Sequence, residues 1–179
     1  DSIRDEKVKV LKSLRRIDRS NVREKTVRGQ YTAGFAQGKK VPGYLEEEGA
    51  NKTSNTETFV AIRVDIDNWR WAGVPFYLRT GKRLPTKCSE VVVYFKTPEL
   101  NLFKETWQEL PQNKLTIRLQ PDEGVDIQVL NKVPGLDHKH NLQITKLDLS
   151  YSETFNQTHL ADAYERLLLE TMRGIQALF

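Results

Sequence analysis

The chain has 179 residues, a net charge of +4 and a hydrophobic content of 38%. This length suffices for one domain with a sizeable core, and the weak, dispersed positive charge gives no reason to expect a nucleic-acid partner. No apolar run is long enough to span a membrane, and the N-terminus lacks the apolar segment of a signal peptide. The single cysteine, Cys88, excludes an internal disulfide and suits a reducing compartment, so we expect a cytoplasmic protein that binds neither nucleic acid nor membrane.

The two ends of the chain predict a fragment of a longer protein. The sequence starts without Met inside a helical pattern, and it stops at Phe179 within another helical pattern that has no cap.

Apolar residues recur at helical spacing near both ends. Ser2 resembles the start of a capping box and opens a helix that we expect to end at about Ile17. A stronger helical pattern begins at His159, with Thr158 as its expected N-cap. Between these helices, the apolar patterning predicts a short strand within 21–32 and further strands at 56–66, 75–80, 90–96, 114–120, 125–133 and 142–151.

Turn formers and loop composition predict how the strands connect. The turn sequence at 121–124 indicates a hairpin, and the continuous apolar run at 90–96 indicates a central strand. Residues 39–56 are polar and acidic, so we expect a loop there, with Tyr44 and Leu45 able to attach it to the surface. We therefore predict one α+β domain over residues 1–179, with a large, mostly antiparallel β-sheet and helices packed on one face.

Positive charge is concentrated just after the strand expected at 75–80. Arg79, Lys82, Arg83 and Lys87 lie within nine residues. Gly81 allows the backbone to take a positive φ, and cations beside such a turn form an anion pocket. A solvated basic loop is the alternative, and charge alone leaves both interpretations open. The apolar strand before the turn keeps the anion site in consideration.

The sequence contains none of the short motifs that mark a complete reactive centre. It has no GxGxxG, P-loop, GxSxG or HExxH pattern. His138 and His140 lack a third ligand at a suitable spacing, so we expect a solvated loop and no metal site there. Cys88 is expected to be a small buried hydrophobe. The residues alone thus indicate either part of an anionic substrate site, without catalytic groups, or a non-catalytic β-sheet module that binds an anion or a partner protein.

Several motifs together resemble one known family. They are DNWRWAGVPF at 67–76, LRTGKRL at 78–84, RLQPDE at 118–123 and DAYERLL at 162–168. The whole chain is similar to the C-terminal domain of glucose-6-phosphate dehydrogenase, and most similar to the enterobacterial members. The resemblance implies an NADP-dependent oxidation of glucose 6-phosphate to 6-phosphogluconolactone in the oxidative pentose phosphate pathway. It also implies a homodimer or homotetramer formed through the sheet.

The resemblance assigns roles to three residues. Lys82 matches a substrate-binding lysine of the family, Lys87 matches a second basic position at the substrate, and Gln120 matches a glutamine that lines the same site. The family's coenzyme fingerprint and catalytic histidine belong to a preceding Rossmann domain, whose motifs do not occur here. The resemblance therefore implies that this chain has no catalytic residue and is inactive alone.

Eukaryotic members also bind a second, structural NADP on this domain. Arg79 and Arg118 match family positions at that site. Cys88 and Val92, however, stand where those members have basic residues, and Asp126 replaces an aromatic residue. The resemblance therefore does not predict a structural NADP site in this chain.

Overall fold

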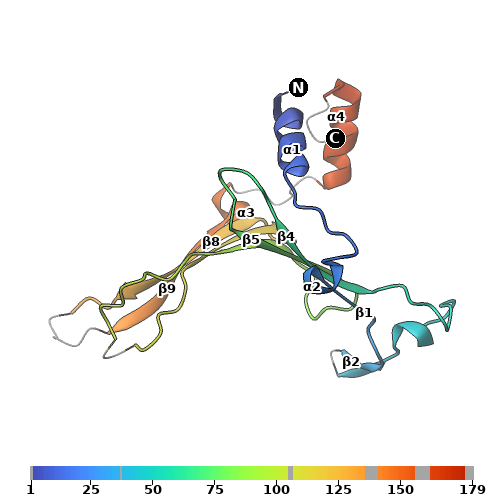
Figure 1. The fold of residues 1–179 in the computed structure, drawn as a ribbon, viewed down its shortest axis with the longest axis horizontal. Helices are drawn as coiled ribbons and strands as arrows, with labels where there is room; N and C mark the ends of the chain where they lie inside the picture. The colour runs from blue at the N-terminus through green and yellow to red at the C-terminus, as the bar shows by residue number, and fades with distance from the viewer. Residues whose placement is uncertain (1, 37, 105–106, 136–140, 156–161, 176–179) are drawn as a thin grey trace. The chain divides into compact units, whose positions relative to one another are not determined.

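The computed structural model describes residues 2–36, 38–104, 107–135, 141–155 and 162–175 (Figure 1). The chain divides into two compact units. The first comprises Asp1–Pro85 together with Ala163–Phe179, and the second comprises Thr86–Asp162. Lys82 thus belongs to the first unit, whereas Lys87 and Gln120 belong to the second.

The first helix, α1 (Ser2–Lys12), ends before the predicted Ile17. The Ser13 hydroxyl donates a hydrogen bond of 2.8 Å to a carbonyl in the preceding helical turn, which competes with continuation of the helix. Leu14 then forms an antiparallel bridge with Ile66, at the end of a strand distant in sequence. The helix is shorter than predicted because the chain after it pairs with the sheet.

The larger of the two sheets in the first unit has three strands. Its antiparallel order is β1 (Thr26–Gly29), β4 (Phe59–Asp65) and β5 (Pro75–Gly81), and a short helix, α2 (Val22–Lys25), precedes β1. The predicted strands at 56–66 and 75–80 are thereby confirmed. Trp71 packs edge-on against Phe76 of β5, with ring centroids 5.3 Å apart, and so anchors the start of that strand.

The segment expected to be a loop contains short elements. β3 (Lys39–Val41) pairs with β2 (Gly34–Ala36), which lies just before the expected loop at 39–56, in a two-stranded hairpin that the sequence did not predict, and a 3-10 turn, η1 (Tyr44–Glu46), follows. A Cβ at Gly43 would lie 2.8 Å from the backbone nitrogen of Ala33. This close backbone approach shapes the segment, and periodicity alone cannot reveal it.

The second unit contains a four-stranded antiparallel sheet in sequence order. Its strands are β6 (Ser89–Tyr94), β7 (Lys114–Gln120), β8 (Gly124–Lys132) and β9 (Leu142–Ser150), and α3 (Tyr151–Thr154) follows. The predicted β7–β8 hairpin is confirmed. The strand at 90–96 was expected to be central, but β6 is at the end of this order. Its apolar run therefore does not reflect burial between two neighbouring strands of this sheet.

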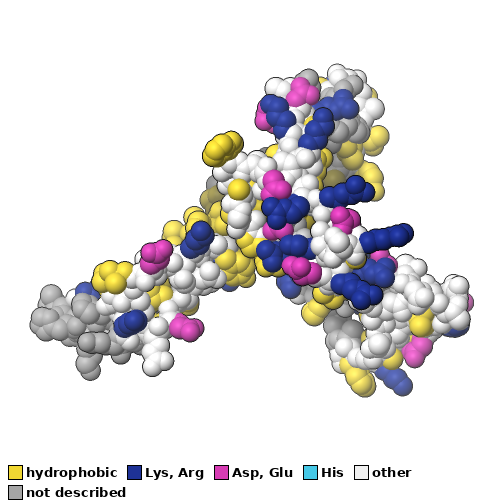
Figure 2. Space-filling view, viewed as in Figure 1, with side chains coloured by type: hydrophobic (Ala, Val, Ile, Leu, Met, Phe, Trp, Pro, Cys, Tyr) yellow, Lys and Arg dark blue, Asp and Glu magenta, His cyan; other side chains and the backbone are white. Residues whose placement is uncertain are grey.

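The register gives the second sheet one polar and one apolar face. Thr116 pairs with Asp126, and Asp126 pairs with Asp148, so these residues lie on the polar face. The apolar face is formed by Val91, Val93, Leu115, Ile117, Val125, Ile127, Leu147 and Leu149. Figure 2 shows hydrophobic side chains at the surface where Figure 1 places β8 and β9.

The predicted class, an α+β chain with mostly antiparallel strands, is confirmed. The strands form three hydrogen-bonded sheets instead of one. The last described helix is α4 (Ala163–Arg173), and the expected start at His159 with its cap Thr158 lies outside the described residues. No helix within the described ranges has the length and apolar character required to cross a membrane.

Candidate functional site

The basic turn after β5 exposes Lys82. Its backbone N–H donates a hydrogen bond of 2.8 Å to the carbonyl of Thr58, just before β4. Its side chain is exposed and makes no ion pair with any described residue. The turn therefore has a fixed backbone at Lys82 and a cationic side chain available to an anion.

Gly81 contributes space to this turn, not the positive φ suggested by the sequence. A Cβ there would lie 3.0 Å from Cδ2 of Phe59 and 3.3 Å from the carbonyl oxygen of Thr58. The positive φ, 53°, belongs to Arg83. Glycine is required because β5 ends close against the residues that open β4.

Arg83 is not a free cation of the turn. Its guanidinium forms an ion pair with Glu47, and its Cζ lies 5.2 Å from the centroid of the Tyr31 ring. The Tyr31 hydroxyl donates a hydrogen bond of 3.1 Å to the same Glu47 carboxylate. The hydrogen bond from Arg83, supported by the one from Tyr31, holds the pKa of Glu47 below its ordinary value. Arg83, Glu47 and Tyr31 are called the Arg83 cluster below.

The other two predicted residues lie near each other in the second unit. Gln120 is the last residue of β7, and its Cα pairs with that of Ser89 at the start of β6. Lys87 precedes Ser89 by two residues, and both Lys87 and Gln120 are exposed. β6 and β7 thus bring Lys87 and Gln120 to the same end of this sheet.

A second charged cluster, not predicted from the sequence, occupies the polar face. Arg118 donates hydrogen bonds to Asp126 at 2.6 Å and to Asp148 at 2.9 Å, while Lys146 lies 3.2 Å from Asp126. The Arg118 hydrogen bond, with further hydrogen bonds involving Asp126 and Lys146, lowers the pKa of Asp148 to about 2. The signal was present as charged residues at alternating strand positions, but the register was needed to bring them together.

The remaining candidates from the sequence do not form a site in the described part of the chain. Cys88 was expected to be buried, but it is exposed because it lies just before β6 and not within a strand. His138, His140 and His159 lie outside the described residues. The described ranges contain no group of three or more His, Cys, Asp or Glu side chains placed to hold a metal ion.

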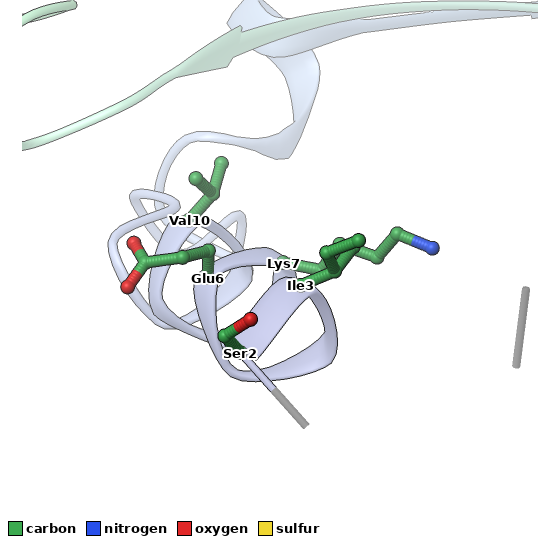
Figure 3. Close-up of a pocket in the computed structure, with 5 residues that line it drawn as sticks. All are labelled: Ser2, Ile3, Glu6, Lys7 and Val10. Carbon is green, nitrogen blue, oxygen red and sulfur yellow. The ribbon is translucent and has the colours of Figure 1, made fainter. Parts of the chain in front are cut away.

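A surface hollow of about 420 Å³ lies along α1. Figure 3 shows its five lining residues, which all come from that one helix: Ser2, Ile3, Glu6, Lys7 and Val10. None of the predicted site residues lies there, so this hollow is a groove along a helix surface and not the candidate site.

The described chain is thus an antiparallel α+β domain that exposes one lysine at a strand end and another before a strand. The chain matches the family model described as "Glucose-6-phosphate dehydrogenase, C-terminal domain" over residues 1–179. The chain belongs to this family. The resemblance stated from the sequence, including the likeness to enterobacterial members, is confirmed.

Named relatives agree over the entire chain. It is 87% identical to the glucose-6-phosphate 1-dehydrogenase of Dickeya dadantii and 52% identical to that of Rhizobium meliloti. Each alignment covers 100% of this chain and 36% of the relative. The chain therefore spans about a third of the length of these relatives.

Solved structures share the fold. One described as "Glucose-6-phosphate dehydrogenase in complex with its substrate glucose-6-phosphate" matches with a TM-score of 0.83 and 37% identity, over 99% of this chain and 34% of that chain. The glucose-6-phosphate 1-dehydrogenase of Mycobacterium avium matches with a TM-score of 0.72 and 34% identity, over 98% of this chain and 33% of that chain.

The polar face carries Arg118, Val92 and Asp126, which were compared above with the structural NADP site of eukaryotic members. Arg118 donates to two carboxylates. The neighbouring hollow of about 270 Å³ is lined by two acidic and two basic residues together with four uncharged ones: Glu90, Asp126, Lys114, Lys146, Val92, Tyr94, Thr116 and Gln128. A phosphate placed there would meet carboxylates as well as lysines, and it would compete with the existing ion pairs.

Proposed function

We propose that this chain is the domain of an NADP-dependent glucose-6-phosphate dehydrogenase that supplies part of the substrate site and the surface for self-association. The full enzyme would oxidise glucose 6-phosphate to 6-phosphogluconolactone, the first step of the oxidative pentose phosphate pathway. The observation that carries the proposal is the exposed side chain of Lys82, which makes no ion pair with a described residue, in a chain 87% identical to a glucose-6-phosphate 1-dehydrogenase.

The three predicted residues would bind and orient the substrate. Lys82 and Lys87 would act as flexible point charges toward the phosphate dianion and the sugar hydroxyls, and the Gln120 amide would supply a neutral donor and acceptor. NADP would accept the hydride removed from the sugar, and residues outside this chain would bind most of it. The proposal assigns no catalytic residue to this chain.

The apolar face of the second sheet would support self-association as a homodimer or homotetramer. Leu147 is 63% exposed, Val91 is 47% exposed and Leu149 is 44% exposed, and all three lie on that face. An extended apolar sheet surface of this kind is typical of an interaction site. A cytoplasmic location is part of the proposal, because the exposed Cys88 suits a reducing compartment.

Steady-state kinetics of the full-length enzyme test the substrate role of Lys82. Lys82→Ala should raise the KM for glucose 6-phosphate about ten- to hundredfold, because a charge-assisted hydrogen bond to the phosphate is lost. The KM for NADP should change little. Lys132→Ala, which removes an exposed lysine at the end of β8, is the matched control.

An unchanged KM for glucose 6-phosphate in Lys82→Ala would remove this residue from the site. Turnover of glucose 6-phosphate and NADP by the 179-residue chain alone would contradict the proposal that the catalytic residue lies outside this chain. The chain should instead be active only when it is mixed with the remainder of the enzyme. A self-sufficient anion-binding module would not contribute to activity in that mixture.

A further inference from the structure

Arg83 has an unusual backbone conformation for its residue type. Arg83 is the only non-glycine residue in the described ranges with a positive φ, which is 53°. Residues with a Cβ rarely adopt this conformation because the Cβ approaches the backbone. A residue keeps such a strained backbone conformation only where contacts with its surroundings hold it there.

The side-chain contacts of Arg83 supply that hold. Its guanidinium pairs with Glu47 and lies over the Tyr31 ring, and the Tyr31 hydroxyl donates to the same carboxylate. The side chains of Arg83 and Glu47 are 39% and 32% exposed, so the pair is partly shielded from solvent. Each member of the Arg83 cluster contacts the other two.

The cluster is also linked to the backbone that carries Lys82. The Tyr31 N–H donates to the Thr58 hydroxyl at 2.9 Å, and the Thr58 carbonyl accepts the Lys82 N–H at 2.8 Å. Tyr31 is itself fixed, because its carbonyl accepts the N–H of Tyr44 at 3.0 Å and the two rings meet edge-on. The contacts therefore form a closed loop. The Lys82 backbone is bonded to Thr58 and Thr58 to Tyr31, the Tyr31 ring contacts the Arg83 side chain, and Arg83 is the residue after Lys82.

We propose that Arg83, Glu47 and Tyr31 are positioning residues for Lys82. They fix the backbone on both sides of the Lys82 Cα, so the lysine leaves the turn in one direction before substrate arrives. Such preorganisation reduces the ordering cost of binding the phosphorylated sugar. This inference rests on the proposed function, in which Lys82 binds that substrate.

A direct contact between Arg83 and the substrate phosphate is the competing assignment. In the structure, Glu47 and the Tyr31 ring already engage the guanidinium. A phosphate would have to compete with the Glu47 carboxylate. The two assignments therefore make opposite predictions for Glu47: removing its charge harms a positioned Lys82 but helps an arginine that binds phosphate.

Kinetics of the full-length enzyme separate the assignments. Arg83→Ala and Glu47→Gln should each raise the KM for glucose 6-phosphate about tenfold, because displacement of a binding group by about 1 Å has effects of this size or larger. The double variant should be no worse than either single variant, since both remove the same support. The KM for NADP and kcat should change less than twofold. Arg83→Lys should restore part of the affinity, because it keeps the charge but not the planar fork.

Arg28→Ala and Glu57→Gln are the matched controls, because these residues form an exposed ion pair at 3.5 Å in the same unit. Both should leave the KM unchanged. A raised KM in Arg83→Ala with an unchanged or lowered KM in Glu47→Gln would overturn the positioning role in favour of direct contact. If Arg83→Ala and Glu47→Gln both lower the melting temperature but leave the KM unchanged, the Arg83 cluster stabilises the fold and does not position Lys82. Parallel measurement of Lys82→Ala distinguishes these results from failure of the proposed function, in which the Lys82→Ala KM would also be unchanged.

Discussion

Lys82 and Arg83 are adjacent in sequence but have different electrostatic surroundings. Lys82 makes no ion pair with a described residue, whereas Arg83 pairs with Glu47, 36 residues earlier in the chain. The sequence identifies both as cations of one turn. It cannot say which one is paired, because the pairing depends on how the 44–47 segment approaches the end of β5.

The ion pairs of Asp148, on the polar face of the second sheet, also depend on contacts between residues far apart in sequence. Its carboxylate accepts from Arg118 at 2.9 Å and lies 3.4 Å from Lys146, and the carboxylate of Asp126 adjoins the same two cations. Two carboxylates and two cations therefore share one patch of the polar face. The cations keep Asp148 ionised to unusually low pH.

This arrangement predicts how Asp148 contributes to stability as the pH changes. Its pKa in the folded chain is about 2, below the ordinary 3.8, so its contribution is complete above pH 3.8 and is lost as the pH falls through about 2. Asp148→Asn should lower the melting temperature at neutral pH, and the difference from wild type should narrow below pH 3.8. Thermal unfolding followed by circular dichroism from pH 7 to pH 2 measures this. A difference that does not depend on pH would contradict the ion-pair assignment.

At the scale of elements, the strands were the most predictable feature. Alternation identified β7 at 114–120 with its observed bounds, and the turn sequence at 121–124 predicted its pairing with β8. The β2–β3 hairpin was not predicted, because it depends on the close approach of Gly43 to the backbone near Ala33. Sheet order also escaped prediction: the apolar run of β6 suggested a central strand, but β6 is at the end of its sheet, with Val91 and Val93 on the apolar face and Val92 on the polar face.

Some of the residues at the candidate site could be named from the sequence, and others could be found only from the structure. Lys82, Lys87 and Gln120 were named from the resemblance, and the structure shows all three exposed at turns or strand ends. Their roles stay a prediction. Glu47 and Tyr31 were not singled out, because their link to the turn is a tertiary contact between side chains far apart in sequence.

The two faces of β9 allow a test of self-association within one strand. Leu147 lies on the apolar face and is 63% exposed, while Ile144 lies on the opposite face and is 45% exposed. Leu147→Lys should raise the dissociation constant of the assembly at least about tenfold, because it would bury an unpaired charge between subunits. Ile144→Lys is the control and should leave the assembly intact. Sedimentation velocity of the full-length enzyme measures both, and equal effects of the two variants would argue against the apolar face as the interface.

At the scale of the whole molecule, the chain has the surface of a part of something larger. It spans 36% of its Dickeya relative, and in the described ranges the only buried apolar side chain is that of Ile66, which is 8% exposed. An extended apolar face, and lysines that make no ion pair with a described residue, are both features of a domain that contacts other parts of a larger protein. Both features are consistent with the proposed function, in which this chain supplies one portion of the substrate site and no catalytic residue.

Calorimetric titration of glucose 6-phosphate into the full-length enzyme tests this claim most directly. The double variant Lys82→Ala/Lys87→Ala should bind the sugar phosphate about a hundredfold more weakly than wild type, because the proposed function has both lysines donate to the substrate. Binding of NADP by the same protein should be preserved, which shows that the variant is folded. Wild-type affinity for glucose 6-phosphate in the double variant would contradict the account.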